Sequence, residues 1–75
     1  MTVSDLGKIL SEMYRKAPHG KQVAKIHLFG VMYADVILRN GFSVKEIVTA
    51  SGINQSYATE VNKGIKLSEY VLPKE

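Results

Sequence analysis

Three breaks divide the chain into segments of helical length. They are Pro18-His19-Gly20, Asn40-Gly41 and Gly52-Ile53-Asn54. Proline disfavours helical dihedrals at the residue before it, and glycine and asparagine tolerate a positive φ, so each break ends an element. Between the breaks, apolar residues recur every three or four positions, which places them on one face of an α-helix. This pattern predicts an all-α chain of short helices joined by turns.

The first two predicted helices cover residues 4–17 and 21–39. Ser4 is expected to cap the first turn of the first helix. Within the second helix, residues 26–32 are apolar on nearly every side and would also suit a short strand, although the helical spacing on both sides favours one buried helix. Gly30 lies in this stretch and disfavours the helix by about 1 kcal/mol relative to alanine.

The strongest local signal is the start of a third helix. Ser43 stands at the N-cap position and Glu46 follows three residues later, which is the sequence signature of a capping box. Phe42 before the cap and Ile47 after it can pack together as a hydrophobic staple. The third helix is therefore predicted over residues 44–51.

A fourth helix is predicted over residues 55–63, with Asn54 as its cap and Gly64 as its end. Residues 65–75 contain several apolar side chains before Pro73. They fit either a last helical turn or a short strand, so the structure of this segment stays open.

Composition narrows the classes of function that a chain of 75 residues can serve. Hydrophobic residues make up 45% and charged residues 23%, as in an ordinary folded domain, so one core is expected. The absence of cysteine excludes disulfides, a thiolate nucleophile and a cysteine-bound zinc ion. His19 and His27 are not accompanied by a carboxylate motif, so we expect no metal ion.

The sequence shows no catalytic constellation and no membrane segment. Because no serine or threonine stands in a recognisable pattern with a base and an acid, and no glycine loop for phosphates is present, we expect no enzyme and no cofactor. Charged residues interrupt the most apolar stretch, and the amino end lacks the basic and apolar regions of a secretory signal. We therefore expect a cytoplasmic protein that does not span a membrane. The formal net charge of +3 is compatible with nucleic-acid binding and does not establish it.

Two short helices joined by a turn that contains glycine form a helix-turn-helix unit. Residues 44–64, VKEIVTASGINQSYATEVNKG, resemble the helix-turn-helix of phage repressors. The matching positions are the turn glycine, the small residue at the helix crossing and three apolar inter-helix residues: Gly52, Ala58, Ile47, Ile53 and Val61. Val48 stands where the motif usually has alanine, and Ser51 where it usually has an apolar residue. The resemblance implies binding of double-stranded DNA, with the second helix of the unit in the major groove.

If the fourth helix is the recognition helix, its exposed side carries side chains that can read bases. Gln55, Ser56 and Thr59 are the predicted base contacts, because glutamine can bond adenine bidentately and hydroxyls can donate or accept at base edges. The predicted phosphate contacts are three basic residues: Lys45, Lys63 and Lys66. Glu60 lies beside this face and would either accept from cytosine or be repelled by the DNA backbone, and the sequence leaves both open.

A single domain is expected over residues 1–75. Residues 1–41 supply two supporting or dimerisation helices, residues 42–64 the helix-turn-helix and residues 65–75 a short C-terminal segment. The second helix carries apolar residues that a lone monomer would expose, namely Leu28, Phe29, Val31 and Met32. A homodimer would bury them and would place two recognition helices about 34 Å apart on a palindromic site.

These features together predict an all-α, compact bundle of four to five helices that contains a helix-turn-helix, binds specific DNA sequences and regulates transcription. Two alternatives stay open. In the first, the chain is a protein-interaction module whose first two helices dock a larger partner. In the second, it is the DNA-binding domain excised from a larger DNA-processing enzyme.

Overall fold

The computed structural model describes residues 1–71, and over that range it contains helices and turns but no strand. The elements are α1 (Val3–Lys16), α2 (Gln22–Asn40), α3 (Val44–Ser51), the short 3₁₀ helix η1 (Gln55–Tyr57) and α4 (Ala58–Leu67). They form a body of 32 × 26 × 21 Å. The prediction of an all-α, compact bundle is confirmed.

The start of α1 differs from the sequence prediction. Thr2 is the N-cap: its Oγ1 accepts from the Asp5 amide at 3.1 Å, and its own amide donates to the Asp5 carboxylate at 2.9 Å. These two bonds form a complete capping box, and the bond from the Thr2 amide lowers the pKa of Asp5 below its ordinary value of 3.8. The prediction of Ser4 as the cap was wrong, because Thr2 and Asp5 form the capping box, so α1 begins at Val3 and Ser4 already lies in its first turn.

The second helix runs without interruption through residues 26–32, so the strand alternative is excluded. It ends, as predicted, at Gly41, which adopts a left-handed φ of 65° and donates its amide to the Leu38 carbonyl at 3.2 Å. The apolar middle of α2 is covered because both α1 and α4 pack against this helix. Among residues 1–71, no helix combines the length and the apolar character that crossing a bilayer requires.

The third helix begins and ends at the predicted residues. Ser43 Oγ accepts from the Glu46 amide at 3.3 Å, which confirms Ser43 as the N-cap. The reciprocal bond from the Ser43 amide to the Glu46 carboxylate is not found among the described residues, so only half of the predicted capping box is present. Phe42 is half-buried against the core cluster that contains Ile47, in agreement with the predicted staple.

The second helix of the helix-turn-helix starts with a 3₁₀ turn and continues past its predicted end. Asn54 Oδ1 accepts from the Ser56 amide at 2.8 Å and so caps η1, and α4 follows directly at Ala58. Gly64 lies inside α4, so the prediction that it ends this helix was wrong. Residues 65–67 are therefore helical and residues 68–70 form a turn, while residues 72–75 lie outside the described range.

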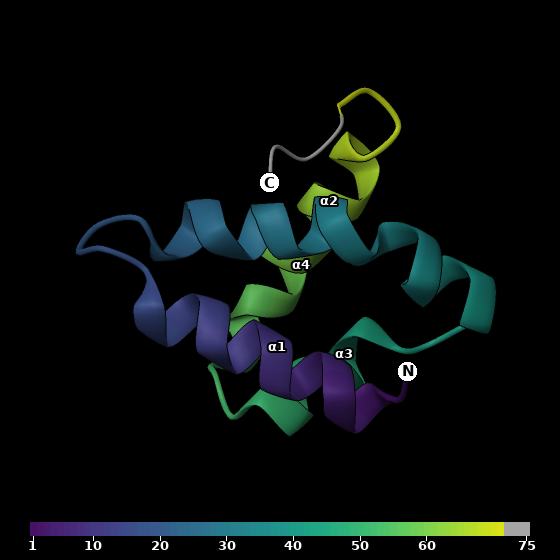
Figure 1. Cartoon of the computed structure of the whole chain (residues 1–75), viewed down its shortest axis with the longest axis horizontal. Helices are drawn as coiled ribbons and strands as arrows, with labels where there is room; N and C mark the ends of the chain where they lie inside the picture. Colours follow the sequence, from purple (N-terminus) through teal and green to yellow (C-terminus); the bar gives the residue numbers. More distant parts are fainter. Residues whose placement is uncertain (72–75) are drawn as a thin grey trace.

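The four α-helices are arranged as two crossed pairs, α1 on α3 and α2 on α4 (Figure 1). Both crossings lie at glycine. A Cβ added to Gly7 would lie 2.6 Å from Ala50 Cβ, and a Cβ added to Gly30 would lie 2.9 Å from Gly64 Cα. Because these separations are too short for real atoms, only glycine lets the supporting helices approach this closely. The close packing at Gly30 therefore offsets its low helix propensity.

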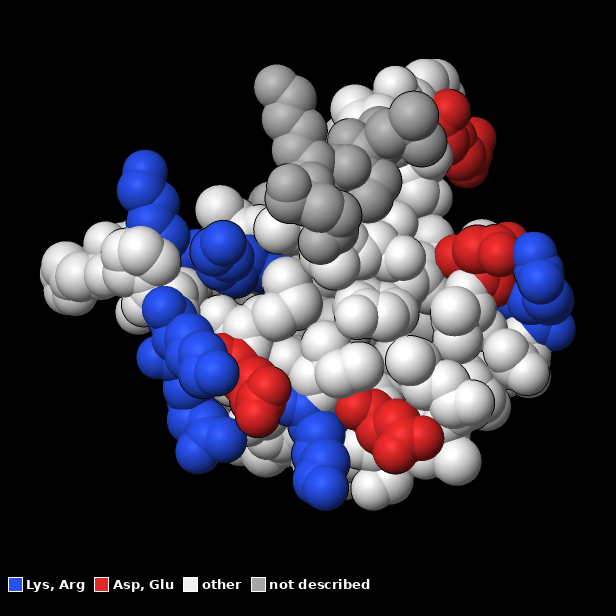
Figure 2. All heavy atoms as spheres, viewed as in Figure 1, with Lys and Arg blue, Asp and Glu red and all other residues white. Residues whose placement is uncertain are grey.

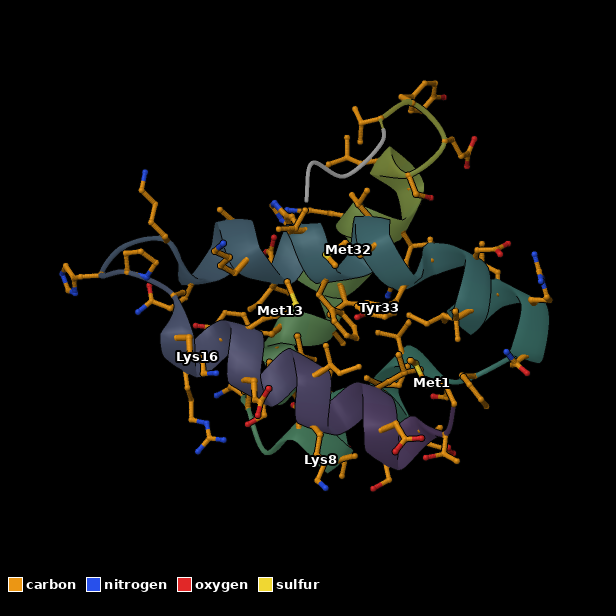
Figure 3. The ribbon with its side chains drawn as sticks, viewed as in Figure 1. Met1, Lys8, Met13, Lys16, Met32 and Tyr33 are labelled. Carbon is orange, nitrogen blue, oxygen red and sulfur yellow. The ribbon has the colours of Figure 1, made fainter. Side chains whose placement is uncertain are left out.

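The core draws on all four α-helices. Phe29 of α2 is fully buried and packs on Tyr33 with ring centroids 5.2 Å apart. Figure 3 shows Met13 of α1 and Tyr33 of α2 pointing into the space between their helices, and Lys8 pointing away from it. The fully buried apolar side chains are Leu6, Leu10, Ile26, Phe29, Ile37, Ile47, Val48 and Val61.

The expectation that Phe29 would be exposed on a monomer was wrong. Its side chain is 0% exposed, because α1 and α4 pack against α2 on the side where Phe29 lies. Leu28, Val31 and Met32 are half-buried. A second copy of the chain is therefore not needed to cover Phe29.

Replacing Gly64 by alanine should destabilise the fold by about 1–3 kcal/mol, the usual effect of overpacking a close contact. A Cβ here would collide with the carbonyl oxygen of His27 and lie 3.0 Å from Gly30 Cα, and both are backbone atoms of α2. At an open helix position the same change stabilises by up to about 1 kcal/mol, so the sign of the effect is diagnostic. Urea unfolding followed by circular dichroism measures the free energy of unfolding.

Asn62→Ala is the matched control, because Asn62 is exposed on the same helix. It should leave the free energy of unfolding within about 0.5 kcal/mol of the wild type, or slightly raise it. A Gly64→Ala protein as stable as the wild type would contradict the close crossing of α2 and α4.

Candidate nucleic-acid interface

The helix-turn-helix corner is formed by three residues between α3 and η1. Gly52 ends α3 with a φ of 81°, in the left-handed region that glycine adopts without steric clash. Ser51 Oγ accepts from the Ile53 amide at 3.2 Å and donates to the Val48 carbonyl at 2.6 Å. The hydroxyl of Ser51 thus satisfies a backbone amide in the turn, which an apolar residue at this motif position could not do.

The apolar residues of the motif close the corner from inside. Ile47 and Val61 are fully buried, and Ile53 and Ala58 are half-buried against the same cluster. Val48, at the position where phage repressors usually have alanine, is also fully buried. The larger side chain therefore adds to the core, and both departures from the motif have a structural role.

A tyrosine pair attaches the corner to α1. The rings of Tyr14 and Tyr57 have centroids 5.4 Å apart, and their hydroxyl oxygens lie 3.4 Å from each other. This hydrogen bond raises the pKa of Tyr57 above its ordinary value of 10.0. The sequence places Tyr57 on the buried side of its helix, but no local pattern identifies a partner 43 residues away.

The predicted base contacts lie at the start of the second helix of the unit. Gln55, Ser56 and Thr59 are all exposed, the first two in η1 and Thr59 in the first turn of α4. Gln55 Nε2 donates to Thr49 Oγ1 at 2.5 Å, and the Thr49 hydroxyl donates to the Lys45 carbonyl at 2.9 Å. Gln55 is therefore anchored to α3 through its amide nitrogen. Thr49 was not predicted, because its partner lies six residues on, beyond a turn whose geometry the sequence does not specify.

The predicted phosphate contacts are exposed as well, on two different helices. Lys63 and Lys66 follow Thr59 at spacings of four and seven residues, so these three side chains form one stripe along α4. Lys45 lies in the first turn of α3 and is not part of this stripe. The α4 stripe thus begins with a hydroxyl and continues with two ammonium groups.

Glu60 faces the supporting helix α2. Its Oε1 lies 2.6 Å from His27 Nε2, and its Oε2 lies 3.6 Å from Lys63 Nζ. The side chains of His27 and Glu60 are 31% and 23% exposed, so their hydrogen bond lies at the edge of the α2–α4 contact. The bond from His27 is the main reason that the pKa of Glu60 lies below its ordinary value of 4.5. His27 is thus hydrogen-bonded, and Glu60 is held by α2.

Comparison with known proteins extends the helix-turn-helix assignment beyond the corner itself. A family model described as an HTH-like domain matches residues 2–74, and so includes α1 and α2 as well as the segment that resembles phage repressors. No curated protein and no solved structure matches the chain. Within residues 1–71, no group of three or more histidine, cysteine, aspartate or glutamate side chains could hold a metal ion.

We predict that the hydrogen bond between His27 and Glu60 raises the free energy of unfolding and that this contribution is lost in acid. Because the folded pKa of Glu60 lies below 4.5, the folded protein keeps this carboxyl ionised to lower pH than the unfolded chain does. The contribution is complete above pH 4.5 and disappears as the pH falls through the folded pKa. Glu60→Gln should therefore be less stable than the wild type at about pH 6, and this deficit should shrink at about pH 3. Urea unfolding at both values measures it.

Glu69→Gln provides the comparison, because Glu69 is exposed in the turn after α4 and forms no ion pair among residues 1–71. Its free energy of unfolding should stay close to that of the wild type at both pH values. A deficit of Glu60→Gln that is the same at both values would show that its ionisation contributes nothing.

Proposed function

Because the chain belongs to the HTH-like domain family, as the match over residues 2–74 shows, we propose that it binds specific sequences of double-stranded DNA through residues 42–64 and regulates transcription. The observation that carries the proposal is the exposed stripe of α4, whose opposite side is pressed against α2 at Gly64. A recognition helix has to hold its outer side chains in a defined place, and a backbone crossing on its inner side does this.

The base-reading residues of the proposed complex are Gln55, Ser56 and Thr59. In a helix-turn-helix, the amino-terminal residues of the recognition helix contact base edges in the major groove, and these three occupy that place. The amide of Gln55 suits adenine, and the hydroxyls of Ser56 and Thr59 can donate or accept. The bond from Gln55 to Thr49 limits the rotamers of Gln55 before DNA arrives, which reduces the entropy lost on binding.

The phosphate contacts of the proposed complex are Lys63 and Lys66 on α4 and Lys45 on α3. All three are exposed, and ammonium groups attract the DNA backbone irrespective of sequence. Glu60 is bonded to His27, which directs its negative charge toward α2 and limits repulsion of the backbone.

The proposed regulator acts in the cytoplasm as a homodimer of single-domain chains, with its two α4 helices about 34 Å apart on a palindromic site. Phe29 no longer supports dimerisation, because it belongs to the monomer core. The support comes from Leu38, which is 66% exposed and which a second copy could cover. Sedimentation velocity tests this part of the proposal, and a monomer at all concentrations overturns it.

A protein-interaction module is the second candidate, supported by the face that carries α1 and α2. Figure 2 shows charged side chains around the margin of this face and an uncharged middle. Met32→Glu would disturb this face with less effect on folding than a change of Phe29, because Met32 is half-buried. Loss of a protein partner with intact DNA binding would favour the module. A DNA-binding domain of a larger DNA-processing enzyme would use the same residues on DNA as the regulator.

Selection from a random DNA pool should enrich one sequence, and Gln55→Ala or Thr59→Ala should weaken binding to it by about 1–3 kcal/mol. Both residues are exposed, so the fold should remain intact, which circular dichroism checks. Ser4→Ala, an exposed hydroxyl on α1, is the control and should bind as the wild type does. Absence of any enriched sequence would contradict sequence-specific recognition.

Lys66→Gln should weaken binding to all DNA sequences to a similar extent and reduce the slope of affinity against salt concentration by about 1. Titrations at several salt concentrations measure that slope. Lys8→Gln removes the same charge from α1, where Figure 3 shows the side chain pointing away from α2, and should have a much smaller effect. Equal effects of the two variants would mean that only net charge matters and that α4 is not the DNA-binding helix.

A further inference from the structure

Basic side chains gather at the end of the molecule where α1 is followed by α2, as Figure 2 shows. Arg15 and Lys16 belong to the last turn of α1. Lys21 is the N-cap of α2, and Lys25 lies in the first turn of that helix. None of these four side chains forms an ion pair within residues 1–71. Their positive charges are therefore available to an anionic partner.

This end of α1 lies beside the start of the second helix of the helix-turn-helix. The rings of Tyr14 and Tyr57 have centroids 5.4 Å apart, and their hydroxyl oxygens lie 3.4 Å from each other. In Figure 1 the green turn that follows α3 lies beside the same end of α1. Tyr57 shares η1 with Gln55 and Ser56, and Arg15 directly follows Tyr14. Arg15 is therefore held close to the residues assigned to base reading.

Arg15 and its neighbour Lys16 lie on different sides of α1. Gly7 and Arg15 are separated by two spacings of four residues, so they belong to one stripe of the helix, and Gly7 packs against Ala50 of α3. Lys16 instead lines a hollow between α1 and α2 together with Lys25. Both Arg15 and Lys16 are exposed. Arg15 is thus on the side of α1 toward the helix-turn-helix, and Lys16 is on the side toward α2.

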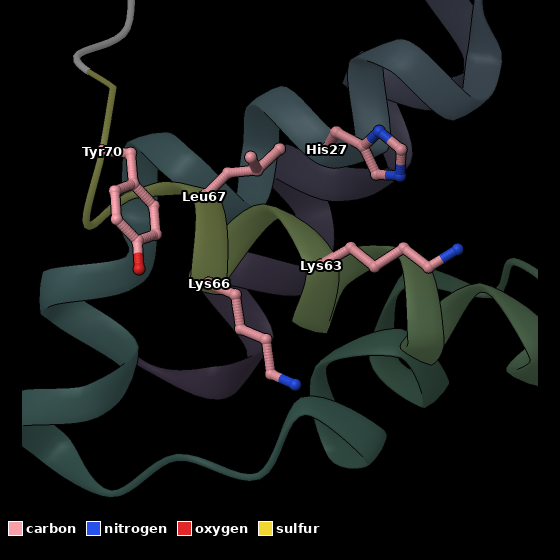
Figure 4. Close-up of a pocket in the computed structure, with 5 residues that line it drawn as sticks. All are labelled: His27, Lys63, Lys66, Leu67 and Tyr70. Carbon is pink, nitrogen blue, oxygen red and sulfur yellow. The ribbon is translucent and has the colours of Figure 1, made fainter.

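The helix-turn-helix itself has no cation near the residues assigned to bases. No lysine or arginine occurs at positions 46–62. Lys63 and Lys66 lie further along α4, and Figure 4 shows them beside a pocket between α2 and the end of α4, with their side chains pointing in different directions. The phosphates of both DNA strands border the major groove, so a helix that enters the groove gains from cations on both of its sides. Arg15 supplies a cation from α1.

We propose that Arg15 binds a phosphate of the DNA backbone next to the bases contacted by Gln55 and Ser56, so that α1 forms part of the DNA-binding surface. A guanidinium group is planar and can donate two parallel hydrogen bonds to one phosphate. The Tyr14–Tyr57 pair holds α1 against η1, which keeps this group beside the base-reading residues. The inference rests on the proposed function and adds to it a contact from a supporting helix.

The test compares Arg15→Gln with Lys16→Gln, which removes the same charge from the adjacent exposed position. Each full chain is titrated with the selected DNA and with random DNA between about 50 and 200 mM salt. Arg15→Gln should weaken binding to both DNAs by about fivefold or more at about 0.1 M salt and reduce the salt slope by about 1. Lys16→Gln should change either affinity by less than about twofold. Arg15→Lys keeps the charge and should retain the slope.

The outcomes separate this inference from the proposed function. Equal effects of Arg15→Gln and Lys16→Gln would overturn the inference, because net charge alone would then explain both. An Arg15→Gln protein with the affinity and the slope of the wild type would also overturn it, while leaving DNA binding through α4 in place. A wild-type chain that binds no DNA would overturn the proposed function and, with it, the role of Arg15.

A second measurement locates the end of α1 on the DNA directly. The chain has no cysteine, so Arg15→Cys introduces a single thiol to which an iron chelate that cleaves nearby DNA can be attached. On the selected DNA, this chelate should cut the backbone beside the recognised bases. Ser4→Cys places the same chelate at the opposite end of α1 and should cut much less at equal occupancy. Cutting from position 15 that is no stronger than cutting from position 4 would overturn the inference.

Discussion

The contact of Gly30 with Gly64 is the constraint on which the remaining geometry depends. The distance between two packed helices is set by the side chains where they cross. Gly30 and Gly64 have no side chains, so the backbones of α2 and α4 contact each other directly. No side chain larger than that of glycine fits at this crossing, so the close approach of α4 to α2 depends on these two residues. The buried side of α4, the bond between His27 and Glu60, and the pocket beside Lys66 are all placed by that contact.

The second glycine crossing supports a different part of the helix-turn-helix from the first. α1 approaches α3 at Gly7 and Ala50, while α2 approaches α4, so each half of the helix-turn-helix is held by a different helix. α3 and α4 pack less extensively against each other than α3 packs against α1 or α4 against α2. The Tyr14–Tyr57 pair completes the arrangement by joining α1 to η1, which is also bonded to α3 through Gln55 and Thr49. A corner with a modest interface of its own is thus fixed by the helices around it.

Local sequence signals predicted most of the fold. The features that they missed depend on contacts between residues far apart in the sequence. Ser43, Asn54 and Gly41 act within one turn of the chain, so their roles could be inferred from neighbouring residues. Gly64 was predicted to end a helix, because its contact with Gly30, 34 positions earlier, leaves no pattern in the local sequence. The candidate interface follows the same rule: the exposure of Gln55 and Thr59 follows from helical spacing, whereas the bonds from Thr49 and His27 join separate elements.

The separation of the two edges of α4 has a consequence for how such a protein can change over evolutionary time. Val61 and Gly64 face inward and admit almost no alternatives, because one is in the core and the other touches backbone. Thr59 and Lys63 face outward, and their replacement leaves the crossing untouched. Mutations on the outward side can therefore alter the proposed preference for DNA sequences. The free energy of unfolding, which depends on the inward side, is preserved. The scaffold is open to diversification at the surface while its architecture is inherited unchanged.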